Sequence, residues 1–164
     1  MTDEILKYVV YSKGGDKEAF GKLYEYYAND MYRFALSICK NTHDAEDAVQ
    51  EAALSVFKSM HGLYDPTKFK SYLFTALSHS CKKTFREKTE EIPENLTYET
   101  QDFISADVKN ALDLLDSVSR EIVLLSAVGG FKSGEIAKIL GLSSVTVRTK
   151  KKRALSKMRK ELEQ

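Results

Sequence analysis

The chain of 164 residues is long enough for one large domain or two small ones, because a core of roughly 60–80 residues is already marginal. Its 43% hydrophobic and 30% charged residues, with a net charge of +1, are typical of a folded globular protein and exclude a disordered chain. No apolar run approaches the roughly 20 residues of a membrane helix, and Cys39 and Cys81 are too far apart for a disulfide framework or a metal site. We therefore expect a cytoplasmic protein with no cofactor, no metal and no direct membrane insertion.

The charge is distributed unevenly along the chain. Residues 1–88 carry 13 basic and 12 acidic side chains, residues 89–118 carry one basic and eight acidic, and residues 119–164 carry 11 basic and four acidic. A neutral block, an acidic segment and a basic block predict two domains and a charged connector. We expect an N-terminal helical domain over residues 1–88, an acidic flexible linker over residues 89–111 and a C-terminal domain over residues 112–164.

The first block predicts four helices with one shared core. A short helix over 3–13 is followed by apolar stripes at three- and four-residue steps over 20–38 and 45–60. The stretch "HGLYDPTK" breaks the pattern, and a fourth helix restarts near Phe69. Because only two prolines and eight glycines interrupt the chain, we predict an all-α fold.

The second block predicts four more helical runs, near 105–115, 118–128, 133–140 and 144–162.

A helix-turn-helix is predicted within the string "SGEIAKILGLSSVTVRTKKK", residues 133–152. The motif needs a small residue where its helices cross, a turn residue that tolerates positive φ, and apolar side chains that lock the helices together. Ala137, Gly141 and Val147 meet these needs in order.

The second helix of this motif is predicted to bind DNA. It should begin near Val145, with Ser143 or Ser144 as its cap, and residues 145–160 hold eight basic side chains and no acidic one. Lysine and arginine give salt-dependent phosphate affinity, while side chains at the start of the helix read bases. A solvated basic face on a three-helix core is the alternative, which the joint spacing disfavours. The predicted DNA contacts are Ser144, Thr146, Arg148, Thr149, Lys150, Lys152 and Arg153.

An apolar stripe in the same stretch predicts a packed helix rather than a loose tail. Its members are Val147, Ala154, Leu155, Met158 and Leu162. Lys151 falls where the stripe favours Leu, and we expect its methylene stem to cover the edge of the core while its amine reaches solvent.

With both halves in view, the chain resembles the sigma-70 family of bacterial RNA polymerase initiation factors, and most of all the two-domain extracytoplasmic-function (ECF) group. The resemblance covers about residues 14–88 and 112–162. Its first half rests on "GDKEAFGKLYEYYANDMYRFAL" and "DAEDAVQEA", and its second half on "REIVLLSAVGGFKSGEIAKILGLSSVTVRTKKKRALSKMRK".

The resemblance implies partners as well as a fold. The acidic helix that contains "DAEDAVQEA" would dock on the clamp of the largest subunit of the polymerase core, through Asp47, Gln50 and Glu51. The helix-turn-helix would read promoter DNA at the −35 element. ECF factors are often held inactive by an anti-sigma factor, so such a partner is also expected, whereas a small-molecule substrate is not.

The resemblance further implies that the loop "GLYDPTK" and the helix after it capture the unpaired strand at the −10 element. Strand capture needs cations along the backbone and aromatic surfaces for bases. The expected contacts are Tyr64, Lys68, Lys70, His79, Lys82, Lys83 and Arg86. The chain departs from the family at Ser78, His79 and Lys83, where the pattern has Arg, Asn and an acid, so no family-wide −10 sequence is assumed.

Three other readings compete with an initiation factor. A two-metal helical enzyme needs Glu-x-x-His pairs, and none occurs, so we expect a non-enzyme. A helix-turn-helix regulator with a helical sensor domain explains the second half of the chain but not "DAEDAVQEA". A sigma-like protein that has lost promoter activity remains open because of the changes between residues 78 and 83.

Overall fold

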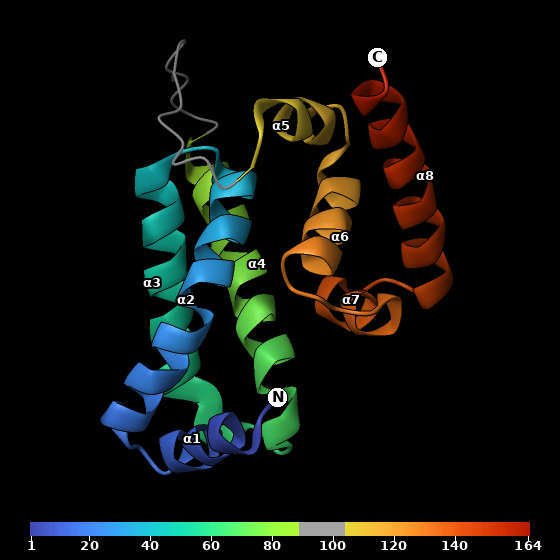
Figure 1. Cartoon of the computed structure of the whole chain (residues 1–164). Coiled ribbons are helices and arrows are strands. Elements are labelled where there is room, and N and C mark those ends of the chain that lie inside the picture. Colours follow the sequence, from blue (N-terminus) through green and yellow to red (C-terminus); the bar gives the residue numbers. More distant parts are fainter. Residues whose placement is uncertain (89–103) are drawn as a thin grey trace. The chain divides into compact units, whose positions relative to one another are not determined.

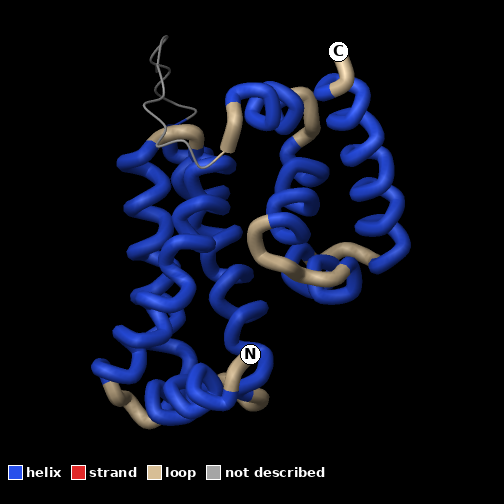
Figure 2. Tube along the Cα trace, in the orientation of Figure 1, coloured by secondary structure: helices blue, strands red, loops and turns tan. Residues whose placement is uncertain are grey.

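The structure, a computed structural model, describes residues 1–88 and 104–164 (Figures 1 and 2). These residues form eight α-helices and two short 3-10 helices and contain no strand. The chain divides into two compact units, with the division between residues 98 and 99. The all-α prediction is therefore confirmed.

The first unit contains the four predicted helices. Its elements are α1 (Asp3–Lys13), α2 (Lys17–Cys39), α3 (Thr42–Ser59), η1 (Met60–Gly62), η2 (Pro66–Lys68) and α4 (Phe69–Lys88). Polar side chains fix where two of the helices begin, since Asp16 accepts hydrogen bonds from the first turn of α2 and Asn41 from that of α3.

In this unit α2, α3 and α4 run side by side, and α1 lies across one end of them (Figure 1). Phe34 of α2 meets Phe74 of α4 edge to face, with 5.9 Å between ring centroids. Ala45, Ala48 and Ala52 are fully buried on α3, so that this helix approaches its neighbours closely. The core thus leaves the opposite side of α3 free to carry charge.

The second unit is built around its last helix. Its elements are α5 (Ala106–Asp113), α6 (Ser117–Ala127), α7 (Ser133–Leu140) and α8 (Ser144–Leu162), and α8 contacts each of the other three.

The predicted linker over 89–111 needs a correction at its end. Residues 89–103 lie outside the described residues, but residues 106–111 belong to α5. Ser105 caps this helix, and Ala111 and Leu112 are buried. The helical run predicted near 105–115 is therefore α5, and it belongs to the second unit rather than to the linker.

Long basic side chains donate hydrogen bonds to backbone carbonyls at the end of α5 and just after it. The guanidinium of Arg120 donates to the carbonyls of Leu112 and Leu115, both at 3.1 Å, and Lys157 Nζ donates to the carbonyl of Leu114 at 2.7 Å. Lys157 therefore serves the fold of this unit.

Among the described helices, none combines the length and the apolar character needed to span a bilayer. The described residues also hold no group of three or more His, Cys, Asp or Glu side chains arranged to bind a metal ion.

Candidate functional site

The helix-turn-helix is formed by α7 and α8. Gly141 ends α7 with φ 67° and ψ 34°, the left-handed conformation that the turn requires. Ala137 is buried and its carbonyl accepts the N–H of Leu142 at 2.9 Å. Ser143, one of the two serines predicted as caps, accepts the N–H of Thr146 at 3.1 Å and so fixes the start of α8.

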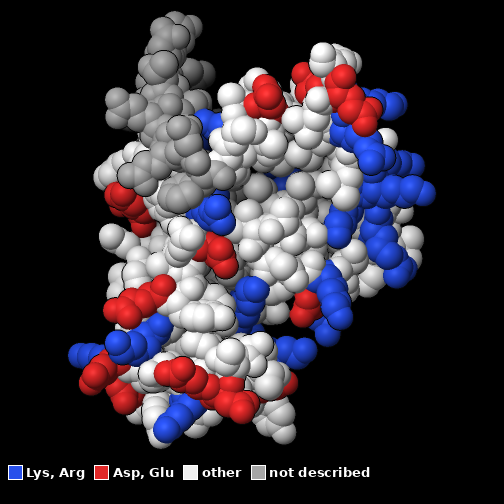
Figure 3. All heavy atoms as spheres, in the orientation of Figure 1, with Lys and Arg blue, Asp and Glu red and all other residues white. Residues whose placement is uncertain are grey.

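The predicted DNA-contacting side chains of α8 lie on its outer face. Lysine and arginine side chains gather along this helix (Figure 3). Thr146 and Lys150 are half-buried, whereas the other five are exposed. Hydrogen bonds from Ser119 hold the pKa of Asp116 below its ordinary value, and the nearby charge of Lys150 adds to this effect. Lys150 therefore lies close to a carboxylate of its own unit. The five exposed members are Ser144, Arg148, Thr149, Lys152 and Arg153.

Fewer residues of the predicted apolar stripe on α8 are buried than the sequence predicts. Val147, Ala154 and Met158 are buried, but Leu155 and Leu162 remain 46% and 48% exposed. Leu155 follows a buried position directly, and one residue rotates the side chain by about 100° away from the core. Lys151 is half-buried within the stripe, as expected for a stem that covers the core edge.

An acidic strip lies on the outer face of α3. Asp47, Gln50 and Glu51 are exposed, while Val49 and the alanines beside them are buried. His43 Nε2 lies 3.4 Å from the carboxylate of Asp47, one turn away on the same helix. The predicted division of α3 into an inward and an outward face is confirmed.

An apolar groove of about 400 Å³ adjoins this strip. It lies between α2 and α3, and Leu54 at its edge is 59% exposed. The rings of Phe20 and Phe57 contact each other there, with 4.9 Å between their centroids. This groove was not predicted from the sequence, although Leu54, an apolar residue outside the buried stripe of α3, was a signal for it. Its lining residues are Lys17, Phe20, Tyr24, Gln50, Ala53, Leu54 and Phe57.

The loop before α4 exposes the first members of the expected strand-binding set. The side chain of Tyr64 is almost completely solvent-exposed, and Lys68 is exposed at the end of η2. Asp65 accepts hydrogen bonds from the hydroxyl and the N–H of Thr67, which lower its pKa and fix the loop. Phe69 is buried.

The remaining members of the set are distributed over two sides of α4. His79, Lys82, Lys83 and Arg86 are exposed at steps of three and four residues, which places them along one side. Lys70 precedes His79 by about two and a half turns and so lies on the other side of the helix.

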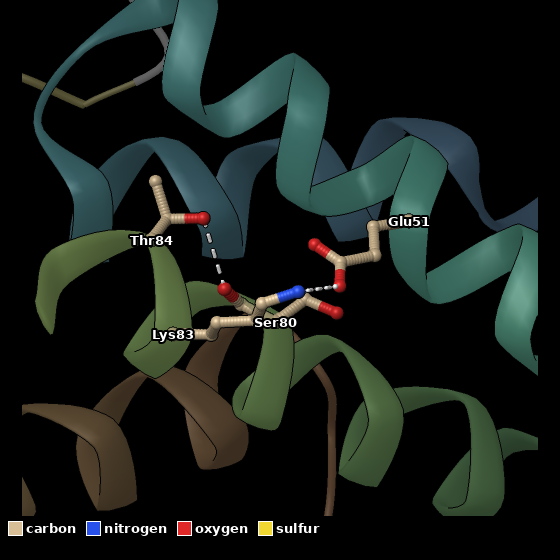
Figure 4. A network of polar contacts seen from close by, with 4 residues as sticks. All are labelled: Glu51, Ser80, Lys83 and Thr84. Carbon is tan, nitrogen blue, oxygen red and sulfur yellow. Dashed lines mark hydrogen bonds and ion pairs between the residues drawn. The ribbon is translucent and has the colours of Figure 1, made fainter. Parts of the chain in front are cut away.

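The acidic strip of α3 and the side of α4 that carries His79 and Lys83 meet in a polar groove of about 390 Å³. Lys83 Nζ lies 2.9 Å from Glu51 Oε1, and the Tyr72 hydroxyl hydrogen bonds with that of Ser59 (Figure 4 shows the first contact). The family resemblance implies that Glu51 contacts the polymerase and Lys83 the DNA, whereas in the structure they contact each other. The groove is lined by Glu51, Ser55, Val56, Ser59, Tyr72, Thr75, Ala76, His79, Ser80 and Lys83.

Comparison with known proteins identifies the family. Residues 23–91 match the model of sigma-70 region 2, and residues 105–158 match that of sigma-70 region 4. The RNA polymerase sigma factor SigV of Bacillus subtilis is 33% identical over 140 residues, which cover 81% of this chain and 84% of that protein. The chain belongs to the ECF group of sigma-70 factors. It is thus a promoter-specificity factor, and the family match to its first domain removes the sensor-domain alternative.

Further relatives of this sigma factor agree. The ECF sigma factor SigX of Bacillus subtilis is 26% identical over 165 residues, which cover 90% of this chain and 85% of that protein. A solved structure, described as CnrH in complex with the cytosolic domain of CnrY, covers 98% of both chains with a TM-score of 0.78 and 25% identity.

Proposed function

We propose that this sigma factor acts in the cytoplasm without catalysis, by docking on RNA polymerase core and positioning it on promoter DNA. The observation that carries the proposal is the pairing, in one chain, of a helix-turn-helix whose last helix is basic with a region 2 helix whose outer face is acidic. Two domains have separate roles in this proposal. The first covers residues 1–88, and the second covers residues 112–164 together with α5.

The second domain would read duplex DNA at the −35 element. The start of α8 is exposed, and in this proposal it enters the major groove, where Arg148 would reach base edges. Lys152 and Arg153, one turn later, would contact phosphates. Their contribution is electrostatic, so the affinity for duplex DNA should fall steeply with salt.

The first domain would hold the unpaired strand at the −10 element. Tyr64 offers an exposed ring for stacking, and Lys68 and Arg86 offer charge to the backbone. Because Lys70 lies on the other side of α4 from His79, these two residues would contact different parts of the DNA.

The acidic strip and the apolar groove beside it would dock on the clamp of the largest polymerase subunit. Asp47 and Gln50 supply polar contacts at the rim, and Leu54 supplies an apolar anchor next to them. An exposed apolar side chain framed by polar residues is the usual composition of a protein interface. The groove suits a helix of the partner, because the side chains of α2 and α3 that line it leave a channel into which the side chains of a third helix can pack.

An anti-sigma factor is the further partner that we propose. The solved structure that covers 98% of this chain is described as a complex with a cytosolic domain of a second protein. Such a partner would cover surfaces needed for polymerase or DNA.

Run-off transcription with purified polymerase core over a promoter library tests the function. The full-length chain should bind core and initiate at a subset of promoters. If core is not bound, the proposal fails. If core is bound and no promoter is used, the chain is instead a sigma-like protein without promoter activity. The ion pair of Lys83 with Glu51 favours this alternative, because it holds a side chain that is expected to bind DNA.

A further inference from the structure

The ion pair between Glu51 and Lys83 joins the two faces of the first domain. Glu51 belongs to the acidic strip of α3 and Lys83 to the cationic side of α4, 32 residues apart in the chain. Both side chains remain accessible, with 46% and 59% of their area exposed. Figure 4 shows the ammonium of Lys83 turned toward the carboxylate across the groove.

We propose that this ion pair couples polymerase docking to capture of the unpaired strand, because Glu51 holds Lys83 in the free protein and releases it when Glu51 engages the polymerase. The inference rests on the proposed function, in which Glu51 contacts core and Lys83 contacts a phosphate of the strand. It assigns a regulatory role to a residue at which the chain departs from its family.

The strength of the pair suits a switch. Exposed ion pairs contribute little, because water screens them and two flexible side chains must be held in one geometry. The pair is therefore strong enough to bias the position of Lys83 and weak enough to be exchanged for a partner's cation. The hydrogen bond and charge of Glu51 raise the pKa of Lys83, and Glu87, one turn later on α4, adds a smaller effect in the same direction. Because the ordinary pKa of a lysine is already far above neutrality, Lys83 is cationic with or without Glu51.

Thermodynamic linkage between core binding and strand binding determines whether each substitution strengthens or weakens binding. If docking of Glu51 releases Lys83, then removal of Lys83 must make docking easier, because Glu51 no longer has a partner to leave. Removal of the Glu51 charge must equally favour strand binding by the free protein. Independent contacts predict neither gain, since each substitution would then only weaken its own interface.

Two binding measurements on the full-length chain test the coupling. The first is the dissociation constant for purified polymerase core, and the second is that for fluorescein-labelled oligothymidine, measured with the free protein and with holoenzyme. We expect Lys83→Met to bind core about two- to fivefold more tightly than wild type. Glu51→Gln should increase the affinity of the free protein for oligothymidine by a similar factor, and this gain should vanish in holoenzyme.

Matched variants separate the pair from general charge effects. Glu46→Gln removes an exposed carboxylate of the same helix, and Lys82→Met removes the neighbouring lysine of the same expected DNA set. Neither should reproduce the gains. The coupling is refuted if Lys83→Met binds core no more tightly than Lys82→Met, or if Glu51→Gln matches Glu46→Gln on oligothymidine. Failure of wild type to bind core refutes the proposed function itself, which keeps the two outcomes distinct.

Discussion

Substitution of Gly141 tests whether the turn of the helix-turn-helix depends on backbone conformation alone. The residue ends α7 in the left-handed region, and a Cβ added there would meet no atom within 4 Å. Gly141→Ala therefore introduces no clash and isolates the conformational cost. Gly134, inside α7, has equally open surroundings but no positive φ, and it provides the matched control.

The two alanines should act in opposite directions. A non-glycine residue in the left-handed region costs roughly 1–2 kcal/mol, so Gly141→Ala should destabilise the second unit by about 1 kcal/mol after the gain from a less flexible unfolded chain. Gly134→Ala should stabilise it by about 0.5–1 kcal/mol, since alanine is the better helix former. Gly141→Asn should lie between Gly141→Ala and wild type, because asparagine tolerates this conformation.

Hydrogen exchange of the α8 amides, followed by mass spectrometry, measures the opening of this unit separately from the first. A loss of about 1 kcal/mol corresponds to roughly fivefold faster exchange. The thermal transition of the whole chain is less suitable, because two units need not unfold together. Equal protection in the Gly141→Ala and Gly134→Ala proteins would show that positive φ is not what the turn requires.

Three further outcomes are expected. Arg148→Ala should abolish promoter-specific run-off transcription while core binding stays normal, whereas Lys151→Leu should leave both intact; equal losses would contradict the division of α8 into two faces. Leu54→Asp should weaken binding to polymerase core at least tenfold in a titration with labelled protein, and Val10→Asp, at a similarly exposed apolar position on α1, should not. Asp116→Ala should remove the cap of α6 and destabilise the second unit by about 1 kcal/mol at pH 7, measured by α8 amide exchange. Because the folded pKa of this carboxyl is lowered, its contribution is complete above about pH 5 and is lost as the pH falls below 3.8, so the gap between the two proteins should close in acid.

The helices were predictable because their signals are local. The apolar stripes on α2 and α3 and the break at "HGLYDPTK" can each be recognised within a short window of sequence. The same holds for Gly141, whose spacing from Ala137 and Val147 encodes a turn. Helix α5 was harder to place in a domain, since its acidic surroundings resemble a linker. The burial of Ala111 and Leu112 shows that it belongs to the core of the second unit.

The residues that line the two grooves could not be predicted from one stretch of sequence, because each groove is formed by side chains of two helices. In an antiparallel pair of helices, a residue earlier in the first helix lies beside a residue later in the second. Ser59 thus meets Tyr72, and Glu51, eight residues earlier, meets Lys83, eleven residues later. The short connection between α3 and α4 implies this arrangement, but the exact register depends on how the buried alanines of α3 seat against α4.

This register changes the meaning of the three departures from the family pattern on α4. Ser78 is buried, so the difference at this position acts on packing and reaches DNA only through the helix. His79 is exposed and lines the polar groove, where it can contact a strand directly. Lys83 faces a carboxylate of α3, so the positive charge that replaces an acid there is matched within the fold. Of the three departures, the one at His79 is therefore the change most directly able to alter which −10 sequence the protein uses.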